Sequence, residues 1–278
     1  MTLDDVDGEP IWPYGENAPM PGGFLSWDRL AVGKRCETWV VWSPSLWSPA
    51  VLKLARPHMV THPRAALALT REVRALHDNP HPVLPRLYAS DVAGPVPFIA
   101  LEYVDGPTLA DEIDDNGKLV ETDVAILGLQ LLTGLRALHG RGLAHVDVKP
   151  DNIVLRDRRP VLVDFGQARE LGATQPAGRP VGTPGYAAPE MEACEPIGTG
   201  MDVYGLGIAL REALTGDPPV QGVPPAPVHD VIDRLCAASP GDRPGLAEAY
   251  VLLRGMLPED ARPWPSWAVP TGAVVGDR

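Results

Sequence analysis

The chain has 278 residues, of which 45% are hydrophobic and 22% are charged, a composition typical of a folded globular protein rather than a disordered one. Its 36 acidic and 24 basic residues give a net charge of −12, which argues against binding to nucleic acid or to an anionic membrane. The three cysteines, Cys36, Cys194 and Cys236, form no CxxC pair, so the sequence predicts neither a disulfide framework nor a zinc site and is typical of a reducing compartment.

Residues 1–26 are rich in proline, glycine and acidic residues, which favours irregular structure, and we expect them to form an extension outside the fold. The first ten residues carry four acids where a secretion signal needs positive charge. The longest nearly apolar run, 124–138, contains Gln130 and Arg136 and is shorter than the about 20 apolar residues that cross a bilayer. We therefore expect a cytoplasmic protein without a membrane segment.

The next segments predict a small, strand-rich part. Residues 40–42 and 51–54 are apolar runs typical of strands, and a proline-containing turn separates them. Residues 64–77 have apolar side chains at helical spacing, and residues 98–104 predict another strand.

The second half of the chain is predicted to be mostly helical. Thr108, with Asp111 three residues later, is typical of a helix N-cap, and residues 121–141 predict a long helix. Short strands and loops are expected after that helix, followed by helices at 206–214 and 228–237.

Two polar motifs lie between these helical regions. Residues 145–152 read His-Val-Asp-Val-Lys-Pro-Asp-Asn, and residues 164–166 read Asp-Phe-Gly. Each motif is weak alone, since an isolated Asp-Phe-Gly is often only a turn. Their order and spacing resemble the catalytic loop and the metal-binding motif of the protein kinase family. The chain resembles bacterial-type Ser/Thr protein kinases, with Val146 in place of the Arg that precedes the catalytic Asp.

The resemblance implies a role for four residues of these motifs. Asp147 would accept the proton of the substrate hydroxyl, and Lys149 would meet the transferring phosphoryl group, as in Ser/Thr-directed members. Asn152 and Asp164 would hold Mg²⁺, or Mn²⁺ in its place, on the phosphates of ATP.

The resemblance also implies a phosphate-binding site in the first half of the chain. Lys53 resembles the strand lysine that contacts the α- and β-phosphates, and Glu72 on the predicted helix would pair with it. Glu72 as a solvated helix charge is the alternative. The family's Gly-rich loop would fall on residues 31–38, where only Gly33 is a glycine and the two residues after it supply positive charge.

The resemblance also implies which residues form the adenine pocket, from their distance along the sequence to Lys53 and Asn152. Leu101 resembles the gatekeeper at the hinge, and the backbone of Glu102 and Val104 would read the adenine edge. Val51 and Val154 would enclose the ring, although plain core positions would have the same apolar character.

The activation segment would span residues 164–190. Thr183 lies in its substrate-facing loop and would bond to the catalytic Asp and to Lys149. Arg179 stands where the usual phosphoacceptor would be, and Val146 cannot pair with a phosphate. We therefore expect activity without phosphorylation of this segment, with Thr174 as the remaining hydroxyl that could be modified.

Three further residues resemble structural supports of the family. Glu190, in Ala-Pro-Glu, and Arg243 would form a buried ion pair, and Asp202 would support the catalytic loop. The stretch 217–227 is dominated by proline and glycine, so the substrate-docking region of the family looks reduced.

The resemblance implies an α+β, bilobal protein-kinase-like fold with a small β-rich N-lobe and a mostly helical, shortened C-lobe. We expect the kinase domain at 27–257, with the N-lobe at about 27–102 and the C-lobe at about 105–257. The proline-rich residues 258–278 are expected to form a loose tail.

The expected function is that of a Ser/Thr protein kinase that uses ATP and Mg²⁺ on a protein substrate, without a nucleic-acid partner and with no oligomeric state predicted. A nucleotide-binding pseudokinase that acts as a scaffold is one alternative, since the Gly-rich loop is eroded. A small-molecule phosphotransferase is the other, and it would predict loss of the Thr183 loop and of Ala-Pro-Glu, which are both present.

Overall fold

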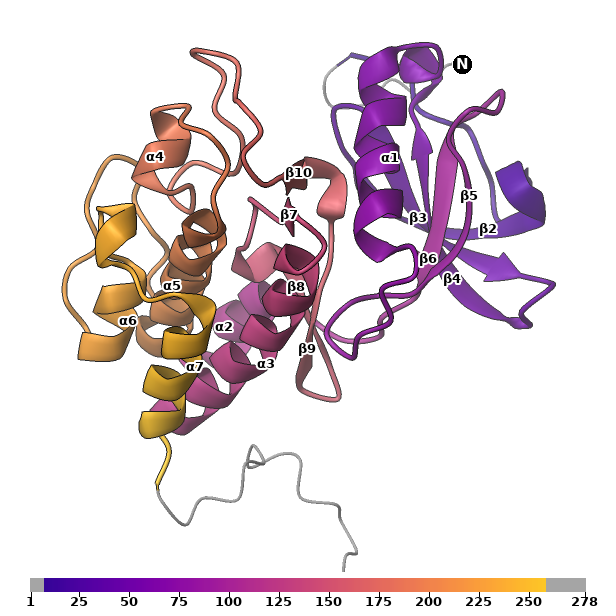
Figure 1. Ribbon diagram of the computed structural model, residues 1–278. Coiled ribbons are helices and arrows are strands. Elements are labelled where there is room, and N and C mark those ends of the chain that lie inside the picture. The colour runs from indigo at the N-terminus through magenta and orange to yellow at the C-terminus, as the bar shows by residue number, and fades with distance from the viewer. Residues whose placement is uncertain (1–7, 259–278) are drawn as a thin grey trace, which may run out of the picture. The chain divides into compact units, whose positions relative to one another are not determined.

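The structure is a computed structural model that describes residues 8–258 (Figure 1). The chain forms two compact units. The first unit runs up to Val104 and also contains Asp164–Ala168, and the second unit comprises Asp105–Val163 and the described residues from Arg169 onward. The sequence-predicted division falls at about 102–105.

The first unit is built on one antiparallel sheet with the strand order β1-β2-β3-β4-β6-β5. The strands are β1 (Pro19–Met20), β2 (Phe24–Val32), β3 (Cys36–Ser43), β4 (Ser48–Ala55), β5 (Leu87–Asp91) and β6 (Phe98–Glu102). One α-helix, α1 (Pro63–Leu76), accompanies this sheet, together with short 3-10 turns at Pro21–Gly23, Pro57–Met59 and Phe165–Gln167.

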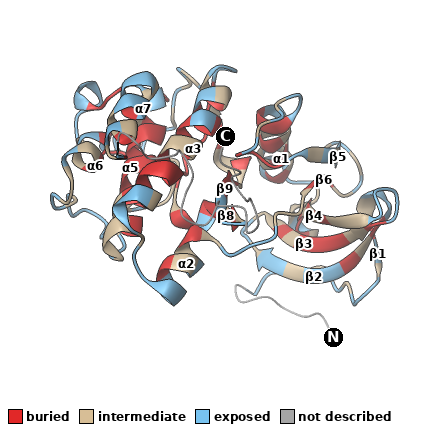
Figure 2. Ribbon diagram, turned by 90° about the horizontal axis from the view of Figure 1, so that it is seen from below, coloured by how far each residue is buried: buried red, intermediate tan, exposed pale blue. Residues whose placement is uncertain are grey.

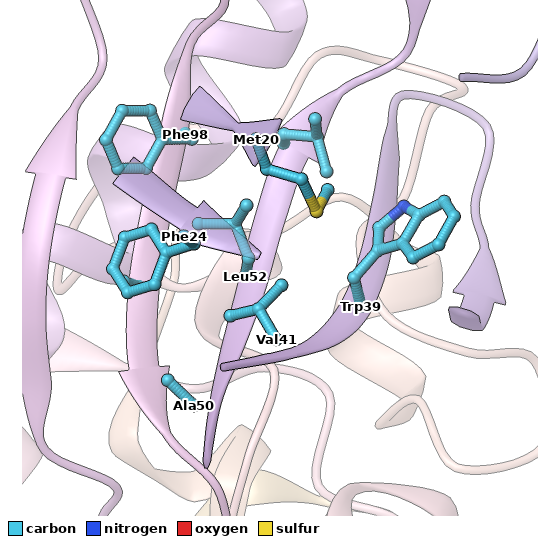
Figure 3. Close-up of a cluster of buried hydrophobic side chains, with 9 residues drawn as sticks. Met20, Phe24, Trp39, Val41, Ala50, Leu52 and Phe98 are labelled. Carbon is cyan, nitrogen blue, oxygen red and sulfur yellow. The ribbon is translucent and has the colours of Figure 1, made fainter. Parts of the chain in front are cut away.

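One hydrophobic core cluster of the unit gathers alternate residues of the strands, because side chains alternate between the two faces along each strand. Figure 3 shows seven labelled members of the cluster, which come from β1, β2, β3, β4 and β6. The whole cluster comprises Met20, Phe24, Trp39, Val41, Ala50, Leu52, Leu54, Phe98 and Ala100.

The prediction that residues 1–26 lie outside the fold is wrong for the part that the structure describes. Met20 and Phe24 belong to the core, and Trp12 and Tyr14 pack against it. The glycines that suggested irregular structure make the tight turn Pro21–Gly23, where a Cβ on Gly22 would lie 2.7 Å from the Phe98 ring. The turn therefore lets β1 and β2 bury Met20 and Phe24 on the same sheet face.

The second unit is mainly helical. Its helices are α2 (Leu109–Asn116), α3 (Glu121–His139), α4 (Pro189–Glu192), α5 (Thr199–Thr215), α6 (Asp230–Leu235) and α7 (Leu246–Gly255). Two short antiparallel pairs complete it, β7 (Leu143–Ala144) with β10 (Arg169–Glu170) and β8 (Ile153–Arg156) with β9 (Arg159–Leu162). The helices α3 and α5 pack together and are buried over much of their length, as the red segments of α5 in Figure 2 illustrate.

Most predicted elements are present with small shifts at their ends. The strands at 40–42 and 51–54 are parts of β3 and β4, and the helices at 64–77 and 121–141 correspond to α1 and α3. Thr108 forms the predicted cap, with a capping box to Asp111. The strand β2 was not predicted, and α5 begins seven residues before the predicted start at 206.

Two further expectations concern the chain ends and the membrane. The tail predicted for 258–278 lies outside the described residues, apart from Pro258. Among residues 8–258, no helix combines the length and the apolar character that a membrane-spanning helix needs.

Placing Phe24 in the core leads to a stability prediction. Phe24 is 5% exposed and its ring lies edge-on to Phe98, with 6.4 Å between the ring centroids. We expect Phe24→Ala to lower the free energy of unfolding by about 3–5 kcal/mol, because it leaves a cavity in the sheet core. The matched control is Trp27→Ala on the same strand, where the ring is 58% exposed and the change should stay within about 0.5 kcal/mol. Urea unfolding measures both, and equal losses would contradict the placement of Phe24.

Candidate active site

A buried ion-pair cluster forms the polar centre of the first unit. Lys53 on β4 donates hydrogen bonds to the carboxylates of Glu72 on α1 and of Asp164, with 2.9 Å from Lys53 Nζ to Asp164 Oδ1. Glu72 is 1% exposed, so the alternative of a solvated helix charge is wrong. The side chain of Asp164 is about half exposed and can therefore face a ligand.

The charges of this cluster stabilise one another. Burial alone would lower the pKa of Lys53, but the carboxylates of Asp164 and Glu72 raise it above its ordinary value. The Lys53 ammonium in turn holds the pKa of Asp164 well below its usual range. Burial raises the pKa of Glu72 against the opposing effect of Lys53. Lys53 is thus a fixed cation and Asp164 a fixed anion near neutral pH.

A pocket of about 360 Å³ opens beside this cluster, within the range of small-molecule sites. The turn between β2 and β3 contributes Gly33, Lys34 and Arg35 to its lining, which also includes Lys53, Glu72 and Asp164. Three basic side chains around one cavity favour a polyphosphate. Cys36 also lines the pocket, and burial raises the pKa of its thiol to about 12, so the thiol stays neutral.

The strand register shows which residues of β3 lie beside the predicted nucleotide-binding residues of β4. Thr38 lies opposite Lys53 in the pairing of β3 with β4, and Val40 lies opposite Val51. Val40 is therefore the β3 residue paired with the predicted adenine residue Val51, and the sequence reasoning did not name it. Gly33 begins the turn, and its N–H donates to the carbonyl of Cys36 at 2.9 Å.

The predicted adenine residues divide between the units. On β6, Leu101 lies opposite Val51, and Glu102 ends the strand. Val104 is the last residue of this part of the first unit, whereas Val154 lies on β8 of the second unit.

The catalytic loop of the second unit converges on Asp147, which is 8% exposed. The hydroxyl of Thr183 donates to Asp147 Oδ1 at 2.6 Å. The amide nitrogen of Asn152 donates to the carbonyl of Asp147 at 2.9 Å and to its Oδ2 at 3.2 Å. The predicted contact of Thr183 with Asp147 is confirmed, while its contact with Lys149 stays a prediction. Lys149 Nζ lies 3.8 Å from the carboxylate of Asp151.

Asp202 holds the backbone that leads into this loop. Its carboxylate accepts hydrogen bonds from the N–H groups of His145 at 2.8 Å and of Val146 at 2.7 Å, and it contacts His139 Nε2 at 2.7 Å. Burial alone would raise the pKa of Asp202, but these donors lower it below its ordinary value. The predicted supporting role of Asp202 is therefore realised through backbone hydrogen bonds.

A second predicted support is also confirmed. Arg243 binds both carboxylate oxygens of Glu190, with distances of 2.5 and 2.8 Å, and its guanidinium lies 4.8 Å from the centroid of the Tyr204 ring. This bidentate pair is almost completely buried and joins α4 to the segment before α7.

The residues implied for a metal ion suit Mg²⁺ by their chemistry. Asp164 offers a partly exposed carboxylate, and the amide nitrogen of Asn152 bonds to Asp147, so its amide oxygen is the atom left to face a ligand. Within residues 8–258, no cluster of three or more His, Cys, Asp or Glu side chains could hold a metal ion by itself.

Comparisons with known proteins decide the family. A family model described as a protein kinase domain matches residues 51–251. The chain belongs to the protein kinase family. The bilobal kinase fold and the bacterial Ser/Thr type predicted from the sequence are thereby confirmed.

The kinase relatives are bacterial. The chain is 30% identical over 256 residues to a probable serine/threonine-protein kinase, PkwA, of Thermomonospora curvata. This alignment covers 91% of this chain and 32% of that protein. It is 32% identical over 231 residues to the serine/threonine-protein kinase PkaA of Streptomyces coelicolor, and this alignment covers 74% of this chain and 42% of that protein. The crystal structure of the Mycobacterium tuberculosis PknI kinase domain matches with 25% identity and a TM-score of 0.69, over 87% of this chain and 97% of that one. The chain thus spans a third to two fifths of the length of these curated relatives.

The buried carboxylate of Asp202 leads to a pH-dependent prediction. We expect Asp202→Asn to lower the free energy of unfolding at pH 7 by about 1–3 kcal/mol, because the amide cannot accept all of the hydrogen bonds. A folded-state pKa below 3.8 means that the carboxylate stabilises the fold above that pH and loses this effect as the pH falls further.

The difference between wild type and Asp202→Asn should therefore be constant from pH 7 to about 4.5 and shrink below 3.8. Urea unfolding at several pH values measures it, with the exposed Asp115→Asn as control. A difference that grows on acidification would contradict the assignment.

Proposed function

We propose that this protein is a Ser/Thr protein kinase that transfers the γ-phosphoryl group of ATP, with Mg²⁺, to a protein hydroxyl. The observation that carries the proposal is the contact of the activation-segment hydroxyl of Thr183 with Asp147, at 2.6 Å. This contact supports a protein acceptor, because it joins the predicted substrate-facing loop to the proposed base. The family membership and the names of the relatives support the same activity.

Each unit supplies a separate part of the proposed reaction. Lys53, kept protonated by its two carboxylate partners, would bind the phosphates in the pocket beside the β2–β3 turn. Asp147 would accept the proton of the acceptor hydroxyl, and Lys149 would neutralise charge on the transferring group. Mg²⁺, held by Asp164 and Asn152, would supply further neutralisation of the phosphates.

The alternative functions explain fewer of these contacts. A scaffold that only binds nucleotide has no need for Asp147 to be oriented by Asn152 and Thr183. A small-molecule phosphotransferase has no need for the Thr183 loop. We also infer a cytoplasmic location, which rests on the cysteine pattern typical of a reducing compartment.

The first prediction from this proposal concerns the catalytic base. We expect Asp147→Ala to lower kcat by about 10²–10⁴-fold, since a positioned general base contributes that much. Binding of ATP should change little, because Asp147 bonds to Asn152 and Thr183 rather than to the phosphate pocket.

Asp164→Ala should also strongly lower the rate of transfer, and in addition it should weaken the Mg²⁺ dependence of nucleotide binding. Initial rates with a protein substrate and nucleotide titrations with and without Mg²⁺ measure both effects, with Asp115→Ala in α2 as a folded control. Undiminished turnover in Asp147→Ala would refute the proposed chemistry.

Neutral hydrogen bonds of Gln175 are among the contacts that hold the middle of the activation segment. Gln175 accepts from the N–H of Val181 at 3.1 Å and donates to the carbonyl of Glu195 at 2.7 Å. Gly182 adopts φ +88°, and a Cβ there would lie 2.8 Å from the carbonyl oxygen of Val146. The segment therefore approaches the catalytic loop closely at a position that needs glycine, without a phosphate.

We accordingly expect phosphatase-treated enzyme, untreated enzyme and Thr174→Ala to have equal initial rates within roughly twofold. Intact mass must verify the phosphorylation state of each sample, and one protein substrate is used throughout. A tenfold lower rate after dephosphorylation or in Thr174→Ala, equivalent to about 1.4 kcal/mol of transition-state stabilisation, would show that a phosphate orders the segment.

A further inference from the structure

The segment 9–14, which we name the clamp segment, is bound to three strands of the first unit through one residue. The indole N–H of Trp12 donates to the carbonyl of Ala55 at 2.8 Å. The backbone N–H of Trp12 donates to Glu37 Oε1 at 2.8 Å, and its carbonyl accepts from Arg29 Nη2 at 2.6 Å. These contacts reach β4, β3 and β2 in turn.

The clamp segment helps to satisfy a buried charge. The carboxylate of Glu37 is completely buried, and it also accepts from the indole N–H of Trp39 at 3.1 Å and lies 3.3 Å from Arg29 Nε. The guanidinium of Arg29 stacks 4.5 Å from the centroid of the Trp39 ring. A buried carboxylate without donors is costly, so the backbone N–H of Trp12 is a functional part of this cluster.

A second buried charge joins the clamp segment to the β2–β3 turn. Arg56, which is 1% exposed, donates from Nη2 to the carbonyl of Glu9 at 2.9 Å and from Nη1 to the carbonyl of Gly33 at 3.3 Å. Its own N–H donates to the carbonyl of Arg35 at 2.9 Å. Gly33 and Arg35 both line the pocket that holds Lys53.

We propose that the clamp segment, acting through Arg56 and Glu37, positions the β2–β3 turn for nucleotide binding, a role that rests on the proposed use of ATP. A Gly-rich loop can approach phosphates closely with its backbone, whereas this turn has one glycine and two basic side chains at its tip. Basic side chains bind phosphate well only when the backbone that carries them is held in place, because ordering a mobile loop opposes binding. Arg56 and Glu37 are positioning residues that do not themselves line the pocket.

The decisive variant is Arg56→Met, which removes both guanidinium hydrogen bonds and keeps an unbranched side chain in the buried site. Mg²⁺ with a non-hydrolysable ATP analogue should bind roughly tenfold more weakly, the loss expected when a charge-assisted hydrogen bond no longer holds the turn. KM for ATP should rise by a similar factor, while kcat stays within roughly twofold of wild type. Arg56→Lys should restore little, because an ammonium cannot reproduce the two-pronged contact. The matched control is Arg64→Met, at an exposed position at the start of α1.

A second variant tests the clamp segment itself and covers the case in which Arg56→Met does not fold. Trp12→Ala removes the bond to Ala55 and the stacking on Tyr14, at 5.6 Å between centroids. Without nucleotide, hydrogen exchange of residues 31–38 should become roughly tenfold faster, since local opening costs correspondingly less free energy. The control is Trp47→Ala, because Trp47 is 79% exposed at the β3–β4 turn.

The outcomes separate the clamp from the proposed activity. The proposed role of the clamp segment would be overturned by a folded Trp12→Ala or Arg56→Met variant that behaves like its control. In such a variant, both the hydrogen exchange of residues 31–38 and the nucleotide affinity would match those of the control. A wild-type protein that binds the analogue without transferring phosphate would overturn the proposed activity and leave the clamp test intact. If the clamp segment only stabilises the fold, the variants will have a lower melting temperature but unchanged nucleotide affinity and unchanged hydrogen exchange of residues 31–38. This outcome also overturns the proposal.

Discussion

A buried carboxylate must be met by cations or hydrogen-bond donors, and this requirement holds Lys53 in the first unit and the backbone before Asp147 in the second. In the first unit, Glu72 and Asp164 together hold the ammonium of Lys53 beside the pocket. In the second unit, Asp202 binds the N–H of Val146, which has φ +58°, a left-handed conformation that is strained for a β-branched residue. The strain is tolerated because the hydrogen bonds of Asp202 over-determine the loop, and the next residue along the chain is the proposed base.

The sequence was sufficient to name the residues on which the proposed phosphoryl transfer depends. Lys53, Glu72 and Asp164 come together as the spacing predicted, because the chemistry restricts both the residue type and the order of the motifs. The contact of Asp147 with Thr183 follows for the same reason.

Some elements and residues were not predicted from the sequence, because they depend on the register between strands or on burial in the folded protein. The strand β2 carries the charged residues Asp28 and Arg29 and has two register shifts, which break the period-two pattern. The helix α5 is buried around most of its circumference and therefore shows little amphipathic period at its start. Val40 is recognised only after the antiparallel pairing with Val51 is known. The proline and glycine content of residues 1–26 hid the fact that Met20 and Phe24 are core residues.

The same principle unites the two features in which this chain departs from its family. A glycine-poor turn and a loop without a phosphate partner each lack a device that would order them when a ligand or a modification arrives. In both places the structure supplies neutral or internal partners instead: Arg56 binds the carbonyls of Glu9 and Gly33, and Gln175 binds Val181 and Glu195. Contacts of this kind are present before any substrate binds, so their entropic cost is met when the chain folds rather than during the reaction. An enzyme built in this way is expected to be competent as soon as it folds, and control would have to act by breaking one of these contacts rather than by adding a charge.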